Sequence, residues 1–138
     1  MSVNFHKMNL NHIALTVSDS EEIENFYEDI LSFRLKYKFV MDANIGWKFF
    51  KRKKGTEVYF MESDGVGLEI FLSPEKGKKL FLHVCFEYPN AKVIHYKANK
   101  RGYKTEVKIN PGKKDTYFIW DKSGNMFELK DIQKGVKS

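Results

Sequence analysis

Apolar and polar residues alternate from Leu10 to Val17, and this alternation predicts a β-strand. One face of the strand is apolar and the other is small or polar, with Ile13, Leu15 and Val17 opposed to His12, Ala14 and Thr16. The histidine therefore points away from the face that a covering helix would bury. A polar side chain in this place needs an explanation.

A capped helix is expected directly after this strand. Asp19, with Glu22 three residues on, has the spacing of a capping box. One apolar stripe follows at helical spacing, made of Ile23, Phe26, Tyr27, Ile30 and Leu31. Three strands are predicted next, over 33–40, 56–63 and 68–72, and Asp64-Gly65 makes the hairpin turn between the last two. Residues 41–54 are ambiguous, and 47–50 could be a short strand or an apolar lid.

The second half of the chain repeats this order of elements. A strand from Leu80, a helix from Pro89-Asn90 to about Arg101 and three further strands are predicted, the last two as a hairpin over 115–130. The two halves, about 8–73 and 80–131, are joined by a linker at 73–79. The sequence thus predicts one α+β domain of two βαβββ modules, whose curved mixed sheets surround a metal-bearing cleft.

Composition narrows the range of functions. The chain has 138 residues, of which 42% are hydrophobic, so an ordered core is expected. The net charge of +6 comes mostly from lysines beside turns, and no nucleic-acid-binding motif accompanies them. We therefore expect no nucleic-acid partner, whereas an anionic small substrate is compatible. The sequence shows no membrane span and no signal-peptide layout, and its single cysteine, Cys85, suits a reducing compartment, so a cytoplasmic protein is expected.

Four polar residues interrupt apolar strands at matched positions in the two halves. His83 follows His12 by 71 residues, and Glu128 follows Glu69 by 59 residues. The difference of 12 residues matches an insertion at 42–54 in the first half. By alternation, both glutamates share the face of the histidines, so four ligands would converge if the two sheets faced each other.

Two imidazoles and two carboxylates suit a divalent transition ion such as Ni, Zn, Co, Mn or Fe, with positions left open for water or substrate oxygens. The ion would polarise a carbonyl or enediolate while Glu128 or Glu69 moves a proton. A single histidine or glutamate in a strand is more often structural, and the argument for a metal rests on the repeated pair. His6 and His95 are interpreted as surface residues, and Cys85 as a wall of the cleft.

These motifs resemble the vicinal oxygen chelate superfamily, which includes glyoxalase I, methylmalonyl-CoA epimerase, fosfomycin-resistance proteins, extradiol dioxygenases and bleomycin-binding proteins. The resemblance covers nearly the whole chain, through 10–17, Phe26-Tyr27 with Leu31, 67–71, 83–86, 121–125 and Glu128-Leu129. It places the metal positions of the family on His12, Glu69, His83 and Glu128. A full set of four resembles the glyoxalase and epimerase branch, in which Glu128 more than Glu69 would be the base.

The resemblance implies a homodimeric, metal-dependent lyase or isomerase that acts on a small carbonyl or oxyanion substrate. Bacterial glyoxalases carry an arginine four residues after the first ligand to hold glutathione, and this chain has Thr16 there, so glutathione is not the expected cosubstrate. Two alternatives stay open. One is a metal-free protein that binds a drug or metabolite, and the other is an iron-dependent ring-cleaving dioxygenase that uses three of the four ligands.

Overall fold

The computed structural model describes residues 10–50, 55–74 and 82–132. The elements are, in chain order, β1 (Ile13–Val17), η1 (Ile23–Glu28), β2 (Arg34–Met41), α1 (Ala43–Phe50), β3 (Thr56–Ser63), β4 (Val66–Leu72), β5 (Val84–Tyr88), α2 (Ala91–Lys100), β6 (Thr105–Lys108), β7 (Thr116–Trp120) and β8 (Met126–Asp131). None of the helices among these residues is long and apolar enough to cross a membrane.

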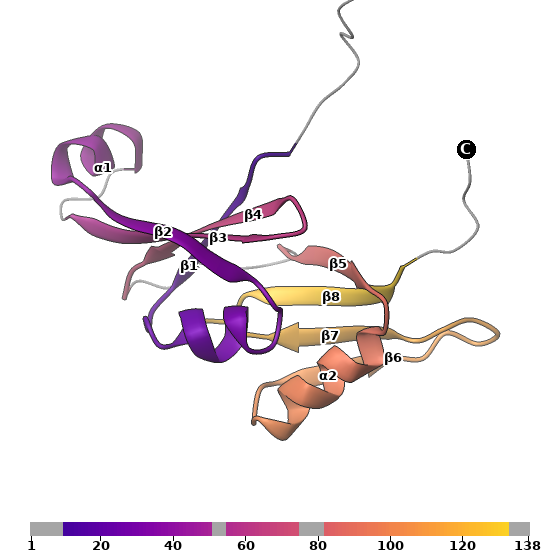
Figure 1. The fold of residues 1–138 in the computed structure, drawn as a ribbon. Coiled ribbons are helices and arrows are strands. Elements are labelled where there is room, and N and C mark those ends of the chain that lie inside the picture. Colours follow the sequence, from indigo (N-terminus) through magenta and orange to yellow (C-terminus); the bar gives the residue numbers. More distant parts are fainter. Residues whose placement is uncertain (1–9, 51–54, 75–81, 133–138) are drawn as a thin grey trace, which may run out of the picture.

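The strands form two four-stranded sheets with the same topology (Figure 1). The first sheet has the order β1-β4-β3-β2 and the second the order β5-β8-β7-β6. In each sheet the first and last strands of that half pair in parallel, and the other pairs are antiparallel. This mixed α+β architecture confirms the predicted fold class, and each half of the chain supplies one sheet.

Both sheets turn one face toward a single shared core. Its largest fully buried side chains come from η1 and the turn after it, from β3 and β4, and from β7 and β8, and they are Phe26, Tyr27, Ile30, Leu31, Met61, Leu68, Ile70, Ile119, Phe127 and Leu129. The Phe26 ring lies 5.0 Å from Tyr103 and 5.7 Å from Phe127. The helix of the first half therefore packs against the second half, and α2 covers the same face of the second sheet.

The helix after β1 differs in detail from the prediction. Residues 23–28 form a wide π-turn, in which the Leu31 amide donates to the Phe26 carbonyl. The predicted capping box is wrong for Glu22, because this side chain is buried and accepts hydrogen bonds from the Tyr103 hydroxyl and the Lys122 amide, both at 2.6 Å. Glu22 therefore connects the two halves instead of capping the helix.

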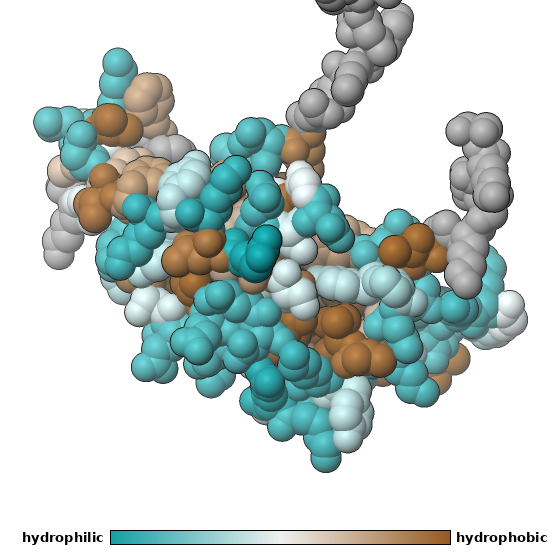
Figure 2. Space-filling view, in the orientation of Figure 1, coloured by the Kyte–Doolittle hydropathy of each residue, from teal (hydrophilic) through white to brown (hydrophobic). Residues whose placement is uncertain are grey.

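Within the ambiguous segment after β2, residues 47–50 are part of a helix and do not form the short strand that the sequence allowed. This helix is α1, and the Asp42 carboxylate caps it by accepting from the Ile45 amide at 3.0 Å. Helix α1 stands away from the shared core at the end of the β2–β3 arm (Figure 1). Ile45, Trp47 and Phe49 are exposed on it, and Figure 2 shows apolar side chains on this arm. The helix is the structural counterpart of the predicted 42–54 insertion, of which 51–54 lie outside the described residues.

Candidate metal centre

The first candidate pair, His12 and Glu69, lies where β1 and β4 run side by side. Ile13 pairs with Leu68 and Ala14 with Glu69, so His12 comes immediately before the first paired residue. The His12 Nε2 atom is 3.7 Å from Glu69 Oε1, and the two side chains are 35% and 21% exposed. Both point away from the shared core, as the alternation predicted.

Neighbouring residues orient the His12 ring. Its Nδ1 atom lies 2.6 Å from the Asn11 side-chain oxygen, which accepts a hydrogen bond in the tautomer that carries the proton on Nδ1. This leaves the Nε2 lone pair pointing toward Glu69, which is the arrangement that metal-ligating histidines need. The edge of the ring contacts Phe60, with ring centroids 5.8 Å apart.

The second pair, His83 and Glu128, stands at the corresponding position of the second sheet. Cys85 pairs with Glu128 across β5 and β8, as Ala14 pairs with Glu69 across β1 and β4. His83 Nε2 is 3.3 Å from Glu128 Oε1, and Lys130 Nζ is 3.3 Å from Glu128 Oε2. The two pairs are thus equivalent in strand and register, as the 71- and 59-residue offsets indicated.

Cys85 is exposed on the same face as Glu128. Partial burial and the nearby Glu128 carboxylate raise the pKa of its thiol. A thiol must lose its proton to act as a nucleophile or a metal ligand, and the raised pKa opposes this loss. The role of Cys85 as part of the wall therefore remains the better prediction.

One chain does not bring the four predicted ligands together. Among the described residues, no group of three or more His, Cys, Asp or Glu side chains is placed to hold a metal ion. The predicted convergence depended on the two sheets facing each other, and within the described residues of one chain this condition is not met. The reason is the shared core: because both sheets bury their helix-covered faces in it, both ligand-bearing faces point outward.

A polar network holds the two halves in this arrangement. Asp121 is buried and accepts hydrogen bonds from the Tyr27 hydroxyl at 2.7 Å and from the amides of Ser123 and Asn125. The Asn125 side chain also donates to the Thr16 carbonyl oxygen at 2.8 Å. These bonds tie the β7–β8 turn to β1 and η1, and so fix the two ligand-bearing faces relative to each other.

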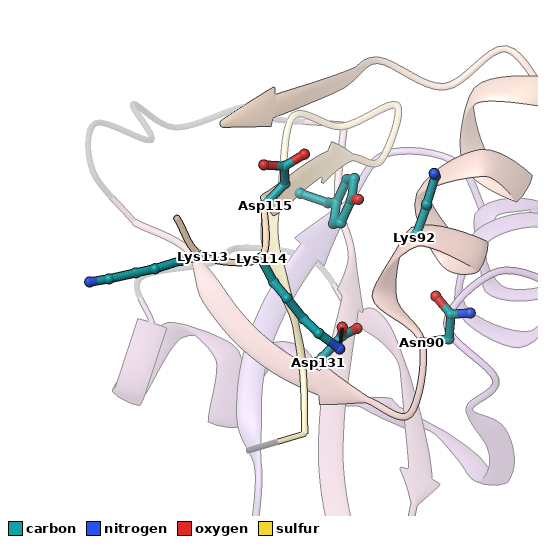
Figure 3. Close-up of a pocket in the computed structure, with 7 residues that line it drawn as sticks. Asn90, Lys92, Lys113, Lys114, Asp115 and Asp131 are labelled. Carbon is teal, nitrogen blue, oxygen red and sulfur yellow. Dashed lines mark hydrogen bonds and ion pairs between the residues drawn. The ribbon is translucent and has the colours of Figure 1, made fainter. Parts of the chain in front are cut away.

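Cavities lined by described residues lie against each of the two sheets. One, of about 440 Å³, lies beside the first pair and is lined by Leu10, Asn11, Lys36, Phe60, Glu62, Gly65 and Gly67. The other, of about 300 Å³, includes Asn90, Lys92, Lys114, Tyr117 and Asp131 (Figure 3). Tyr117 and Asp131 alternate with the residues of the ligand-bearing face, so this second cavity opens on the opposite side of the sheet. None of the four candidate ligands lines either cavity, but Asn11 and Gly67, which line the first, contact His12.

Three contributors to the site were not predicted from the sequence. Asn11 orients His12, Lys130 contacts Glu128, and Gly67 leaves room for the chain at Asn11 and His12. A signal was present for Lys130, since it is two residues after Glu128 and therefore on the same face. Asn11 and Gly67 carry no such signal, because their roles depend on the pairing of β1 with β4.

Comparison with known proteins agrees with this architecture. Residues 9–129 match the model of the Glyoxalase/Bleomycin resistance protein/Dioxygenase superfamily, and the chain belongs to this superfamily. This confirms the resemblance seen in the sequence motifs. A search of curated proteins gave no match.

Solved structures share the fold at low sequence identity. A glyoxalase family protein from Enterococcus faecalis superposes with a TM-score of 0.68 at 21% identity, covering 91% of this chain and 97% of that one. A point mutant of the fosfomycin resistance protein FosX from Listeria monocytogenes, complexed with Mn(II) and a dihydroxypropylphosphonic acid, superposes with a TM-score of 0.70 at 17% identity. The match covers 91% of this chain and 94% of that one. The trypanothione-dependent glyoxalase I of Leishmania major superposes with a TM-score of 0.66 at 16% identity, and the match covers 91% of this chain and 87% of that one.

Proposed function

We propose that this protein is a metal-dependent lyase or isomerase that acts on a small carbonyl or oxyanion substrate. The observation that carries the proposal is the repeated pair: each sheet holds one histidine Nε2 within 4 Å of one glutamate oxygen, at the same strand register. A structural histidine explains one such pair readily. Two equivalent pairs on outward-facing strands are better explained by a common ligand.

The donor atoms fit a divalent transition ion. His12 and His83 would supply neutral imidazole nitrogens, and Glu69 and Glu128 would supply carboxylate oxygens, a set suited to Ni, Zn, Co, Mn or Fe. The contact of His12 Nδ1 with the Asn11 side-chain oxygen supports this assignment, because it favours the tautomer in which Nε2 can bind a metal. The Mn(II) bound by the FosX mutant from Listeria monocytogenes gives a precedent within the same fold.

A second copy of the chain would complete the centre. Since each chain carries one pair on each sheet, a symmetric dimer can bring the first pair of one copy to the second pair of the other. The same contact occurs twice in such a dimer and gives two complete centres. The proposed protein is therefore a homodimer with shared sites.

The chemistry follows from the side chains around the pairs. When bound, the metal would polarise a substrate carbonyl and stabilise the oxyanion that forms from it. The two histidines would hold the metal in place, whereas a carboxylate would accept a proton from the carbon next to the substrate carbonyl and return it. Phe60 pairs with Glu69 and Phe118 with Glu128 across the strands, so an apolar ring borders each carboxylate and limits access of water.

Glutathione is not proposed as a cosubstrate. Thr16 lies on the ligand-bearing face two residues after Ala14, at the place where the resemblance to bacterial glyoxalases would require an arginine. A threonine has no charge with which to hold a glutathione carboxylate. The substrate is accordingly expected to bind without this thiol.

Metal analysis tests the proposal directly. Protein purified without chelators should contain about one divalent ion per chain, and His12→Ala or His83→Ala should remove it. His95→Ala is the matched control, because His95 packs on Tyr117 at the other side of the sheet. If the wild-type protein holds no stoichiometric metal, or if His12→Ala leaves the metal content unchanged, the proposed function is wrong.

A second candidate is a metal-free binding protein for an aromatic or apolar metabolite or drug. The cavity lined by Asn11, Phe60 and Gly67 has a volume of about 440 Å³, which is enough for a small molecule, and Phe60 is the aromatic part of an otherwise largely polar lining. The Phe60 ring in its wall stacks on Tyr37 at 5.1 Å, which gives a planar apolar surface. Ligand binding that is insensitive to EDTA and to Glu128→Gln would select this candidate over the enzyme.

A further inference from the structure

The cavity at the start of α2 contains polar groups that the protein itself does not use. Its volume is about 300 Å³. The lining residues come from α2, from the β6–β7 loop and from the last two strands, and they are Asn90, Lys92, Lys113, Lys114, Asp115, Tyr117 and Asp131. Among the described residues, the Lys92 ammonium, the Tyr117 hydroxyl and the Asn90 side chain have neither a hydrogen bond nor an ion pair. Polar groups that converge on one cavity are typical of ligand sites.

The ion pair between Lys114 and Asp131 adds no net charge to this cavity. Lys114 Nζ lies 2.8 Å from Asp131 Oδ2, and Asp131 Oδ1 accepts from the Ala91 amide at 2.8 Å. The Asp131 carboxylate is thus satisfied, and its charge also offsets the positive N-terminus of α2. Lys113 leaves the interior of the cavity unchanged, because Figure 3 shows its side chain pointing away from Asp131.

Lys92 and Asp115 therefore carry the charges that have no counter-charge. Lys92 lies in the first turn of α2 and has no acidic partner in the part of the chain that the structure describes. Asp115 accepts only from the Asn110 amide, at a long 3.4 Å. Figure 3 shows Lys92 on the side of α2 and Asp115 on the loop before β7. The cavity is accordingly positive at one end and negative at the other.

Tyr117 belongs to the negative end of the cavity. Burial first, and then the carboxylates of Asp115 and Asp131, raise the pKa of its hydroxyl. The hydroxyl therefore keeps its proton, and its oxygen can accept a hydrogen bond from a cation. The ring packs on His95 with centroids 4.9 Å apart, which fixes its position in the wall. A cation bound by Asp115 would have this phenol beside it.

We propose that this cavity binds the zwitterion of a small amino acid. The carboxylate of the ligand would pair with Lys92 and accept from the Asn90 amide group, and its ammonium would pair with Asp115 and donate to the Tyr117 oxygen. A simple anion leaves Asp115 without a counter-charge and a simple cation leaves Lys92 without one, so both are disfavoured. The cavity opens on the opposite side of the second sheet from the second candidate pair, and the proposal is independent of the metal centre.

A titration of the ¹⁵N-labelled full-length chain, followed by NMR chemical shifts, tests the requirement for both charges. Glycine, β-alanine and 4-aminobutyrate carry the two charges at increasing separation, and acetate and methylamine are matched controls with one charge each. One of the amino acids should shift the amides of Asp115 and Tyr117 saturably and bind roughly 10-fold or more tightly than either control, because it makes one more charge-assisted contact. If none of the three binds more tightly than the controls, the proposal is wrong.

Variants of the two charged ends give a crossed pattern. In Lys92→Met the amino acid should bind no better than methylamine, and in Asp115→Asn no better than acetate. Lys113→Met is the matched control, since it removes the same charge as Lys92→Met from a side chain that points away, and its affinity should equal that of the wild type. An unchanged affinity in Lys92→Met, or an equal loss in Lys113→Met, would overturn the proposal.

Metal analysis of the same variants separates this site from the proposed function. Lys92→Met and Asp115→Asn should hold as much metal as the wild type, because both side chains lie away from the candidate ligands. Loss of metal in these two variants would show that the cavity and the metal centre are not independent and would contradict the proposal. Absence of metal from the wild type contradicts the proposed function and leaves the amino-acid titration as a complete test of this cavity.

Discussion

Single residues decide how the strands present the first candidate pair, and Gly67 shows this most clearly. It lies opposite His12 on the neighbouring strand, since the next residue, Leu68, pairs with Ile13. A Cβ atom at this position would overlap the Asn11 carbonyl oxygen and approach the Phe60 ring to 2.9 Å. The close contact between β1 and β4 therefore requires a residue without a side chain.

We predict that Gly67→Ala displaces Asn11 and His12 and lowers both stability and metal content. Overpacking of this kind costs about 1–3 kcal/mol, which urea unfolding monitored by circular dichroism would detect. Gly55→Ala is the control, because the nearest atom to a Cβ there is at 3.5 Å, an ordinary contact distance. Equal metal content and stability in the two variants would show that β1 can shift without loss.

The sequence identified the candidate residues better than their surroundings. His12 and Glu69 could be placed on one face because alternation in a strand is a local property. The restraint of Glu128 by Lys130 and of His12 by Asn11 depends on side-chain directions that alternation alone does not specify. The convergence of all four ligands was predicted from the repeat, but the repeat contains no information on which faces of the two sheets form the core.

At the scale of whole elements, α2 shows how a helix can be capped from a distant strand. The sequence predicted that Pro89-Asn90 begins this helix, yet the Asn90 side chain makes no capping hydrogen bond. Asp131, at the end of β8, accepts from the Ala91 amide at 2.8 Å, and Lys114 contacts the same carboxylate at 2.8 Å (Figure 3). The N-terminus of α2 is thus fastened to the second sheet.

Replacing Asp131 by Asn keeps an oxygen that can accept from the Ala91 amide but removes the negative charge at the N-terminus of α2, and should destabilise the protein by roughly 0.3–1 kcal/mol. The hydrogen bond from Lys114 and, to a smaller extent, that from Ala91 lower the pKa of Asp131. The Asp131 carboxylate therefore stabilises the folded protein fully above the ordinary aspartate pKa, and this stabilisation is lost as the pH falls below that value. The difference between wild type and Asp131→Asn should therefore shrink in acid.

Unfolding by urea at pH 7 and at pH 3 measures this difference. Asp115→Asn is a suitable control, since Asp115 borders the same cavity and its contact with the Asn110 amide is a long 3.4 Å. A difference between wild type and Asp131→Asn that is the same at both pH values would contradict the charge of Asp131 as its source.

Other elements were predicted with varying success for physical reasons. Strand β3 begins and ends where expected, because Gly55 and Asp64-Gly65 bound it and the turn places both Asp64 and Gly65 at positive φ. Helix α1 was missed because its apolar residues lie on more than one side, which hides the helical period. The Asp42 cap was the available signal.

The whole molecule is held together by buried polar groups as well as by its apolar core. Tyr27 is fully buried and donates to Asp121, so burial first, and then the adjacent carboxylate, raise the pKa of Tyr27 well above its ordinary value. The folded protein keeps this proton at pH values where an unfolded tyrosine, with a pKa of roughly 10, releases it. Stability should therefore decrease as the pH rises through that range.

Comparison with Tyr27→Phe tests this expectation. The variant should be less stable by roughly 1–3 kcal/mol at pH 8, since Asp121 loses a buried hydrogen bond. It should also lose stability more slowly than the wild type above pH 10, because it lacks the titrating hydroxyl. Parallel pH dependence of the two proteins, measured by thermal unfolding between pH 8 and 11, would exclude Tyr27 as the cause.

The outward direction of the two ligand pairs has a consequence for mixtures of variants. A chain with His12→Ala and Glu69→Ala lacks the first pair, and a chain with His83→Ala and Glu128→Ala lacks the second, so neither should bind metal alone. When the two are unfolded together and refolded, each mixed dimer contains one centre built from the intact pair of each chain. If the refolded mixture binds metal that neither variant binds alone, the two defective chains complement each other. If the mixture binds no metal, the shared centre is ruled out.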